Sequence, residues 1–200
     1  MSSPARLRAG SRGAVSTEDL DALPRRVFLD SCTLQTLRDY GCFIWEGEPL
    51  DIDDRLHSIP DGVANVEALR KIFLVGERAP FEWILSEASI AEASDKRDRD
   101  HLQWALDVLE HTLTCLHESG GPTTTSVAHA KLVDGARFNF LSAKDRQLVR
   151  DAVLFDCDAF LTMERHLPRN AQFIQRELGL QVLRPIQHWA LLNPWANLWA

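Results

Sequence analysis

The sequence predicts one α/β domain built on a central, mostly parallel sheet with helices on both faces. Short apolar runs alternate along the chain with longer stretches of helical periodicity, and this alternation favours a parallel sheet. The 200 residues are 45% hydrophobic, which is enough for one core of ordinary size. The first apolar run, residues 25–29, is followed at once by an acid, Asp30.

Four apolar runs are predicted to be strands, and helices are predicted between them. The strands are expected at residues 25–29, 81–85, 159–162 and 180–185, where Pro185 ends the last run. The helices are expected at residues 31–40, 61–76, from Ser86 through Ile90 and beyond, 101–119, and from a cap at Ser142 or Asp145 to Phe155. Residues 121–140 are a connector without an assigned structure.

Charge and composition exclude several classes of protein. A net charge of −7 argues against a protein that coats nucleic acid by bulk positive charge, although a local basic rim could still hold a phosphate backbone. The four cysteines are scattered and form no C-x-x-C pair, so neither a disulfide scaffold nor a zinc ribbon is expected, and a cytoplasmic location fits best. No apolar run reaches the roughly 18 residues of a membrane helix, and we expect no membrane association.

The two ends of the chain differ in composition from its middle. Residues 1–23 are rich in Ser, Gly, Pro and Arg, and they are expected to form a disordered tail before a domain at residues 24–190. Residues 191–200 are an apolar tail that continues a tryptophan-rich segment. This tail either folds back onto its own core or contacts a partner or a second copy, and stacking on RNA bases is a third alternative.

Acidic and hydroxyl side chains at the carboxyl ends of the predicted strands are the candidate functional groups. Functional groups of parallel sheets collect at that edge, and Asp30, Thr162 and Glu164 all follow a strand. A buried Asp30 carboxylate would cost several kcal/mol unless a cation, a metal or hydrogen-bond donors compensate it. Taken alone, Asp30 could equally be a helix N-cap. Asp158 precedes its strand and is expected at the opposite edge, in turn chemistry.

Helical positions separate the remaining acids into candidates and surface residues. Glu92 lies on a small-residue face, whereas Glu87 lies in the first helical turn, where acids favour the helix dipole. Asp145 shares the inward stripe of its helix with Leu148. Asp151 is turned away by about 120° and is expected to be a solvated surface acid.

These segments resemble the PIN domain (PilT N-terminus) nuclease family, in which acids fall on strand ends and helix faces in this order. The resemblance runs from about residue 27 to 185. "VFLDSCTL" resembles the segment of the first acid, "WILSEASIAE" that of the second, and "DRQLVRDAVLFDCDAFLTMER" those of the third and fourth. The chain departs from the family pattern at Cys32, where a polar residue is common, and at the fourth acid, where Asp is commoner than Glu. Residue by residue, the four acids of the family fall on Asp30, Glu92, Asp145 and Glu164.

The resemblance implies a three-layer α/β/α fold and hydrolysis of phosphodiester bonds in single-stranded RNA. Asp30, Glu92 and Asp145 would hold one or two Mg²⁺ or Mn²⁺ ions, which prefer oxygen ligands. A metal-bound water would be the nucleophile, and a second ion would stabilise the leaving oxygen. Ser31 and Thr162 would orient waters or carboxylates.

The resemblance also implies partners and leaves alternatives open. Arg165, His166 and Arg169 would hold the RNA backbone beside the acids. The protein would be either a toxin restrained by an antitoxin protein or a housekeeping enzyme, and a homodimer is a further alternative. A second class of function is a catalytically weak PIN-fold binding or regulatory module. Phosphatases with an aspartate nucleophile are disfavoured, because their second aspartate would fall on Cys32.

Overall fold

The four strands of the protein form a parallel sheet at its centre. The computed structural model describes residues 20–93 and 98–199. The strands pair in the order β2-β1-β3-β4, with every pair parallel, so the predicted parallel sheet is confirmed. Each strand lies within its predicted segment. Their bounds are β1 Arg26–Leu29, β2 Glu82–Ile84, β3 Ala159–Leu161 and β4 Gln181–Leu183.

Helices make up most of the described chain. Their bounds are α2 Ser31–Asp39, α3 Gly62–Gly76, α4 Glu87–Ala93, α5 Arg99–Glu118, α6 Thr124–Val133, α7 Ala143–Leu154, α8 Ala171–Leu178 and α9 Pro185–Leu192. The unassigned connector therefore contains a helix, α6. Its start is fixed by the Thr123 hydroxyl, which accepts a hydrogen bond from the Ser126 amide. None of the helices in the described ranges has the length and hydrophobicity to cross a bilayer.

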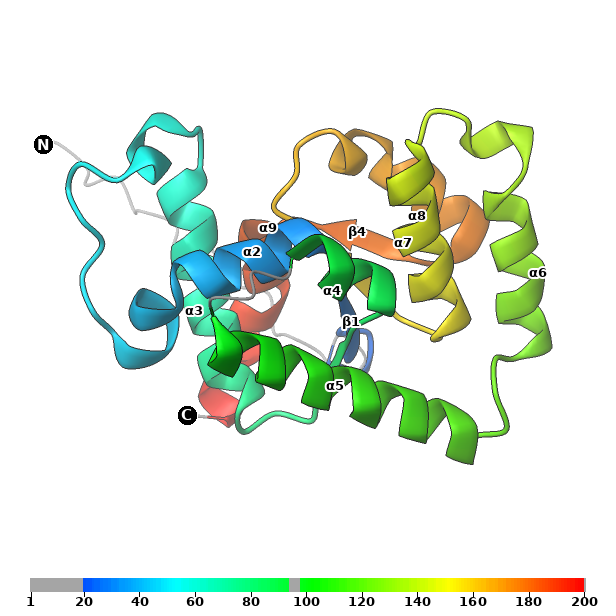
Figure 1. Cartoon of the computed structure of the whole chain (residues 1–200), viewed down its shortest axis with the longest axis horizontal. Helices are drawn as coiled ribbons and strands as arrows, with labels where there is room; N and C mark the ends of the chain where they lie inside the picture. The colour runs from blue at the N-terminus through cyan, green and yellow to red at the C-terminus, as the bar shows by residue number, and fades with distance from the viewer. Residues whose placement is uncertain (1–19, 94–97, 200) are drawn as a thin grey trace, which may run out of the picture.

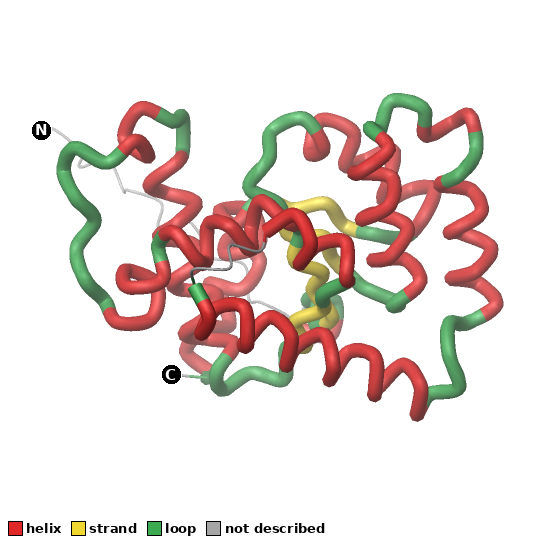
Figure 2. The backbone as a smooth tube through the Cα atoms, in the orientation of Figure 1, coloured by secondary structure: helices red, strands yellow, loops and turns green. Residues whose placement is uncertain are grey.

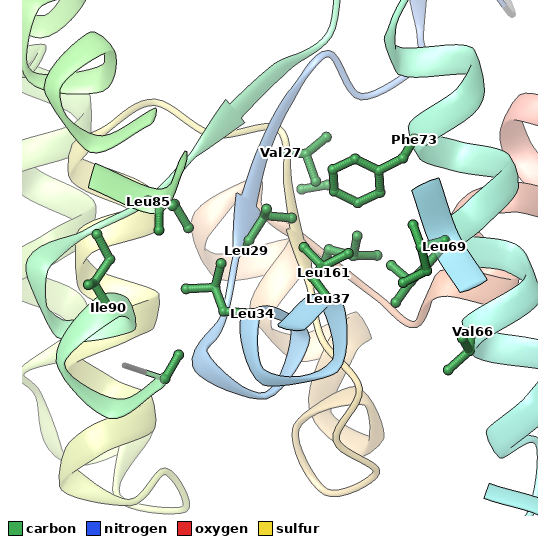
Figure 3. Packing of buried hydrophobic residues seen from close by; sticks show 14 of the residues in the cluster. Val27, Leu29, Leu34, Leu37, Val66, Leu69, Phe73, Leu85, Ile90 and Leu161 are labelled. Carbon is green, nitrogen blue, oxygen red and sulfur yellow. The ribbon is translucent and has the colours of Figure 1, made fainter. Parts of the chain in front are cut away.

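Side chains of the strands alternate between two separate cores, one on each face of the sheet. Val27 and Leu29 point into the core that α2, α3, α4 and α5 cover (Figure 3). Phe28 and Phe160 stack on the other face, with ring centroids 5.2 Å apart, among residues of α6, α7 and α8. Figure 1 shows α3 and α9 toward one end of the molecule and α6, α7 and α8 toward the other. The sheet is therefore covered on both sides.

The long helix α5 is less buried than its leucine stripe suggests. Leu109 is buried, but Leu106 and Leu113 of the same stripe are 43% and 44% exposed. A helix of 20 residues is about 30 Å long, whereas a three-residue strand spans about 10 Å. The helix therefore extends past the sheet that it covers, and part of its apolar face stays outside the core.

The apolar C-terminal segment folds back onto the chain itself. Leu192 is fully buried against Leu23 and Ile72, and the partly buried Trp195 and Trp199 pack on the same cluster. The predicted boundary at residue 190 falls inside α9. Of the predicted N-terminal tail, residues 1–19 lie outside the described residues, whereas Leu23 belongs to this cluster.

This packing predicts unequal effects of two leucine truncations in the tail. Leu192→Ala should lower the free energy of unfolding by about 2–5 kcal/mol, because it leaves a cavity in a closed cluster. Leu198→Ala is the control, since Leu198 is 63% exposed and its loss should have little effect. Urea denaturation of both variants checks this, and equal stabilities would mean that the tail does not pack as described.

The helix α9 also buries a histidine without hydrogen-bond partners. His188 is fully buried, and neither ring nitrogen has a partner among the described residues. Its ring meets the Phe81 ring edge-on, with centroids 6.4 Å apart. Burial lowers the pKa of His188 to about 4, because the charged imidazolium would lose its hydration.

A lowered histidine pKa predicts acid destabilisation in a defined pH range. Between pH 6.5 and 4 the unfolded chain binds a proton at His188 that the folded chain does not bind, so stability falls as the pH falls. The loss should approach about 3 kcal/mol at pH 4. His188→Leu keeps an apolar side chain of similar size and should remove this part of the pH dependence. Urea denaturation at pH 7.5 and pH 5 measures it, with His117→Ala on the exposed face of α5 as the control.

Candidate functional site

The candidate site lies where the connections of the sheet change direction. The strands β1 and β3 are neighbours, but the chain goes on from β1 to β2 at one edge and from β3 to β4 at the other. A parallel sheet has a crevice at the carboxyl ends of such a pair, where ligands commonly bind. Asp30 directly follows β1, and Thr162 directly follows β3.

Asp30 is buried, and it joins the two strand ends. One carboxylate oxygen accepts a hydrogen bond from the Thr33 amide at 2.7 Å, so Asp30 is the N-cap of α2. The other oxygen accepts a hydrogen bond from the Thr162 hydroxyl. Burial raises the pKa of Asp30 to about 6, even though these two hydrogen bonds lower it, and the nearby Glu164 adds to the rise. The N-cap role and a strand-bridging role are therefore combined in one carboxylate.

Glu164 and Cys32 lie next to this carboxylate. The Thr162 hydroxyl accepts a hydrogen bond from the Glu164 amide at 3.0 Å, which fixes the turn after β3. The Cys32 thiol lies 3.5 Å from a carboxylate oxygen of Glu164 and donates to it. Burial, together with the charges of Asp30 and Glu164, raises the pKa of the Cys32 thiol far above its usual range. Cys32 is therefore a neutral donor in this site.

Glu92 reaches the site from α4. The Ser31 hydroxyl donates to one of its carboxylate oxygens at 2.8 Å, and Lys144 lies 3.1 Å from the other. Burial alone would raise the pKa of Glu92, but the Ser31 hydrogen bond and the Lys144 charge together lower it. Glu92 is therefore held as a charged group.

The structure gathers a different set of acids from the one expected to hold metal. Asp30 directly follows β1, and the carboxylates of Glu92 and Glu164 contact the side chains of the next two residues, Ser31 and Cys32. These three acids therefore lie near the carboxyl end of β1. The Asp145 carboxylate instead accepts hydrogen bonds from the Ser142 hydroxyl and amide in a capping box at the start of α7. It is engaged in capping the start of α7 rather than joined to the other acids.

The two residues predicted to orient the acids lie at the site, whereas the three predicted to hold RNA are exposed. Ser31 and Thr162 each hold a carboxylate of the site, as expected of them. Arg165 is exposed, and its guanidinium donates to the Pro60 carbonyl at 2.6 Å. His166 and Arg169 are exposed in and beside the short helical turn Leu167–Asn170.

Asp158 and Asp151, which are not among the predicted site residues, have surroundings that differ from those expected. Asp158 lies at the opposite edge of the sheet, but it accepts hydrogen bonds from the amides of Arg25 and Arg26, both at 2.9 Å. It therefore anchors the start of β1 across the sheet instead of shaping a local turn. Asp151 is partly buried, not fully solvated. Burial raises its pKa, partly offset by hydrogen bonds with Ser86 and Gln147.

A groove of about 300 Å³ opens beside the carboxylates. Cys32 and Glu164 belong both to the carboxylate site and to the lining of the groove. Its other walls come from α2, the first turn of α3, the excursion at residues 42–61 and the segments after β3 and β4. Figure 2 shows the backbone of these elements. Sequence reasoning missed its arginines Arg55 and Arg184, because nothing in the sequence places residue 55 next to residue 184.

The side chains of the site have the ligand chemistry that suits a hard divalent cation, but their positions are less suitable. Carboxylate oxygens are the ligands that Mg²⁺ and Mn²⁺ prefer, and the carboxylates of Asp30, Glu92 and Glu164 lie near the end of β1. Within residues 20–93 and 98–199, however, no three Asp, Glu, His or Cys side chains are grouped closely enough to ligate one ion. Glu92 and Glu164 have flexible side chains, and binding would require them to turn.

Comparisons of the chain with models of known protein families, with curated proteins and with solved structures found no match.

Asp30→Asn is predicted to leave the protein at least as stable as the parent at pH 7.5. Asparagine can still cap α2, and it removes a buried charge whose raised pKa costs up to about 3 kcal/mol above pH 6. The cost disappears as the pH falls from 6 to 3.8, because the folded parent then takes up the proton first. Urea denaturation at pH 7.5 and pH 4.5 should therefore show the larger gain at pH 7.5. A clear loss of stability at pH 7.5 would contradict this account of Asp30.

Proposed function

We propose that the chain is a PIN-like, metal-dependent ribonuclease that hydrolyses phosphodiester bonds of single-stranded RNA. The observation that carries the proposal is the network of hydrogen bonds that holds Asp30, Glu92 and Glu164 at the carboxyl ends of β1 and β3, where the connections of the sheet change direction. Asp30 has a raised carboxylate pKa and lies two residues before Cys32, which lines the groove, and such perturbed groups are common at functional sites. The groove with arginines beside these acids supports an anionic substrate.

Three residues of this chain would hold the metal ion. They are Asp30, Glu92 and Glu164, and Asp145 could join them only after it leaves the capping box. Bound Mg²⁺ or Mn²⁺ would supply a Lewis acid that activates water and stabilises the negative charge on the phosphate and leaving-group oxygens. Thr162 would keep the Asp30 carboxylate oriented, and Ser31 would do the same for Glu92.

Lys144 supplies a positive charge next to Glu92 and is not a metal ligand. It neutralises Glu92 in the structure, and its side chain is 75% exposed. If Glu92 held a divalent ion, it would no longer need Lys144 as its counter-charge. Lys144 would then be released toward solvent, where a phosphate of the substrate could meet it.

A second candidate function is a catalytically weak module of the same fold that binds RNA or a regulatory partner. The observation that favours it is that two of the expected metal ligands already have partners. Glu92 is paired with Lys144, and Asp145 is bonded to Ser142. An antitoxin protein and a homodimer are partners that either function could have, and they stay predictions.

Purified protein should cleave an unstructured RNA with Mn²⁺ or Mg²⁺ and stop when EDTA is added. Asp30→Asn, Glu92→Gln and Glu164→Gln should each lower the rate by more than about 100-fold, beyond the 10–100-fold loss typical of outer partners of a metal site. Glu87→Gln is the matched control, because Glu87 is an exposed acid on the same helix as Glu92.

The variants also separate the two assignments of the third metal ligand, Glu164 or Asp145, and the two functions. If Asp145→Asn is inactive while Glu164→Gln is active, the metal set is the one the family resemblance implies, and Asp145 must leave the capping box. Cleavage that persists in EDTA would contradict a metal-dependent reaction. RNA binding without any cleavage would favour the binding module.

A further inference from the structure

We propose that the groove beside the carboxylates binds the phosphodiester backbone of a single-stranded nucleic acid, with Arg55 and Arg184 holding phosphates away from the reacting one. This inference rests on the proposed function, because it places the strand that would enter the carboxylate site. The groove residues that carry charge are Asp39, Arg55, Glu164, Arg165 and Arg184.

The groove is formed in advance by a set of side-chain ties. Residues 42–61 run out beyond α2 and α3 and return at α3 (Figures 1 and 2). The Tyr40 hydroxyl donates to Asp54 at 2.9 Å, and Arg55 lies 3.1 Å from Asp39 at the end of α2. The excursion is therefore fixed against α2 along one wall.

The opposite side of the groove is tied in the same way. Arg165, after β3, donates to the Pro60 carbonyl, and Arg184, after β4, lies 3.1 Å from Asp61. Gly62 lets the excursion turn tightly into α3, since a Cβ there would lie 2.6 Å from the Leu56 carbonyl oxygen. A single-stranded nucleic acid that enters the groove would therefore meet walls that are already held in place. Little of the binding free energy would be lost in ordering them.

Arginines outnumber acids in this groove although the whole chain is acidic. Three arginines and two carboxylates line it, whereas the net charge of the protein is −7. A guanidinium has five N–H donors, and the contacts to Asp39, Pro60 and Asp61 use only part of them. The Arg55 side chain is 73% exposed, so its remaining donors can reach a phosphate.

The position of the groove favours a nucleic acid strand over an acidic peptide. Glu164 and Cys32 line the groove and also belong to the carboxylate site, so one continuous ligand can occupy both. The lining also has apolar atoms from Leu56, Ile59 and Met163, with Tyr40 beside them. These surfaces suit sugars and bases, which have apolar faces between the charges of the backbone.

The test measures binding of a labelled single-stranded oligouridylate in EDTA, so that no cleavage is needed. Arg55→Gln should weaken binding several-fold and should lower the slope of log affinity against log salt by about 0.7, the value for one lost phosphate contact with a single strand. Asp39→Asn should act in the opposite direction, because it frees Arg55 from its ion pair. Arg176→Gln is the matched control, since Arg176 is a 68% exposed arginine of α8 that is also paired with one acid.

The outcomes test the groove assignment separately from the ribonuclease proposal. If Arg55→Gln binds the oligouridylate as tightly as Arg176→Gln does, or if the parent does not bind it, the groove assignment is wrong whether or not the protein cleaves RNA. If Arg55→Gln weakens binding and no metal-dependent cleavage is found, the groove stands and the ribonuclease proposal fails. Competition by polyglutamate at the same charge concentration, as effective as that by unlabelled RNA, would overturn the nucleic acid assignment in favour of an acidic peptide.

Discussion

The hydrogen bond between Thr162 and Asp30 is the interaction on which the rest of the site depends. It connects the ends of β1 and β3, while the same aspartate caps α2 and the same threonine fixes the turn that carries Glu164. A buried carboxylate is expensive unless it is fully hydrogen-bonded, and here both of its oxygens are used. Strand, helix and turn therefore meet at one side chain, and any change at Asp30 acts on fold and site together.

The acids around this point have structural partners as well as a possible chemical role. Ser31 and Lys144 hold Glu92, Cys32 donates to Glu164, and Asp145 belongs to a capping box. A metal ion would have to replace some of these contacts, because the same oxygens cannot fully serve both. The affinity for metal would then be set by the difference between two well-satisfied arrangements rather than by the acids alone.

Features that depend on local periodicity could be predicted from the sequence. Contacts between residues that are far apart in the sequence could not. The strands, a cap at Ser142 and the N-cap alternative for Asp30 follow from local spacing, whereas the engagement of Asp145 with Ser142 in a capping box was not predicted. The contact of Lys144 with Glu92 joins residues that no periodicity relates. The helix α6 was missed because consecutive threonines have low helix propensity, and its position is set by packing on α7.

The burial of α9 shows how the segments outside the sheet still shape the site. Leu192 and His188 hold α9 against α3 and its neighbours, and Arg184 directly precedes α9. The buried Asn65 of α3 accepts a hydrogen bond from the Ile186 amide, which fixes the start of α9 on that helix. Arg184 lies between the end of β4 and the start of α9, so the sheet and the packed C-terminal helix together place it opposite Asp61. The Arg184 side of the groove thus depends partly on the packing of the apolar C-terminal segment, and that packing would help to position an arginine that we propose to contact the nucleic acid.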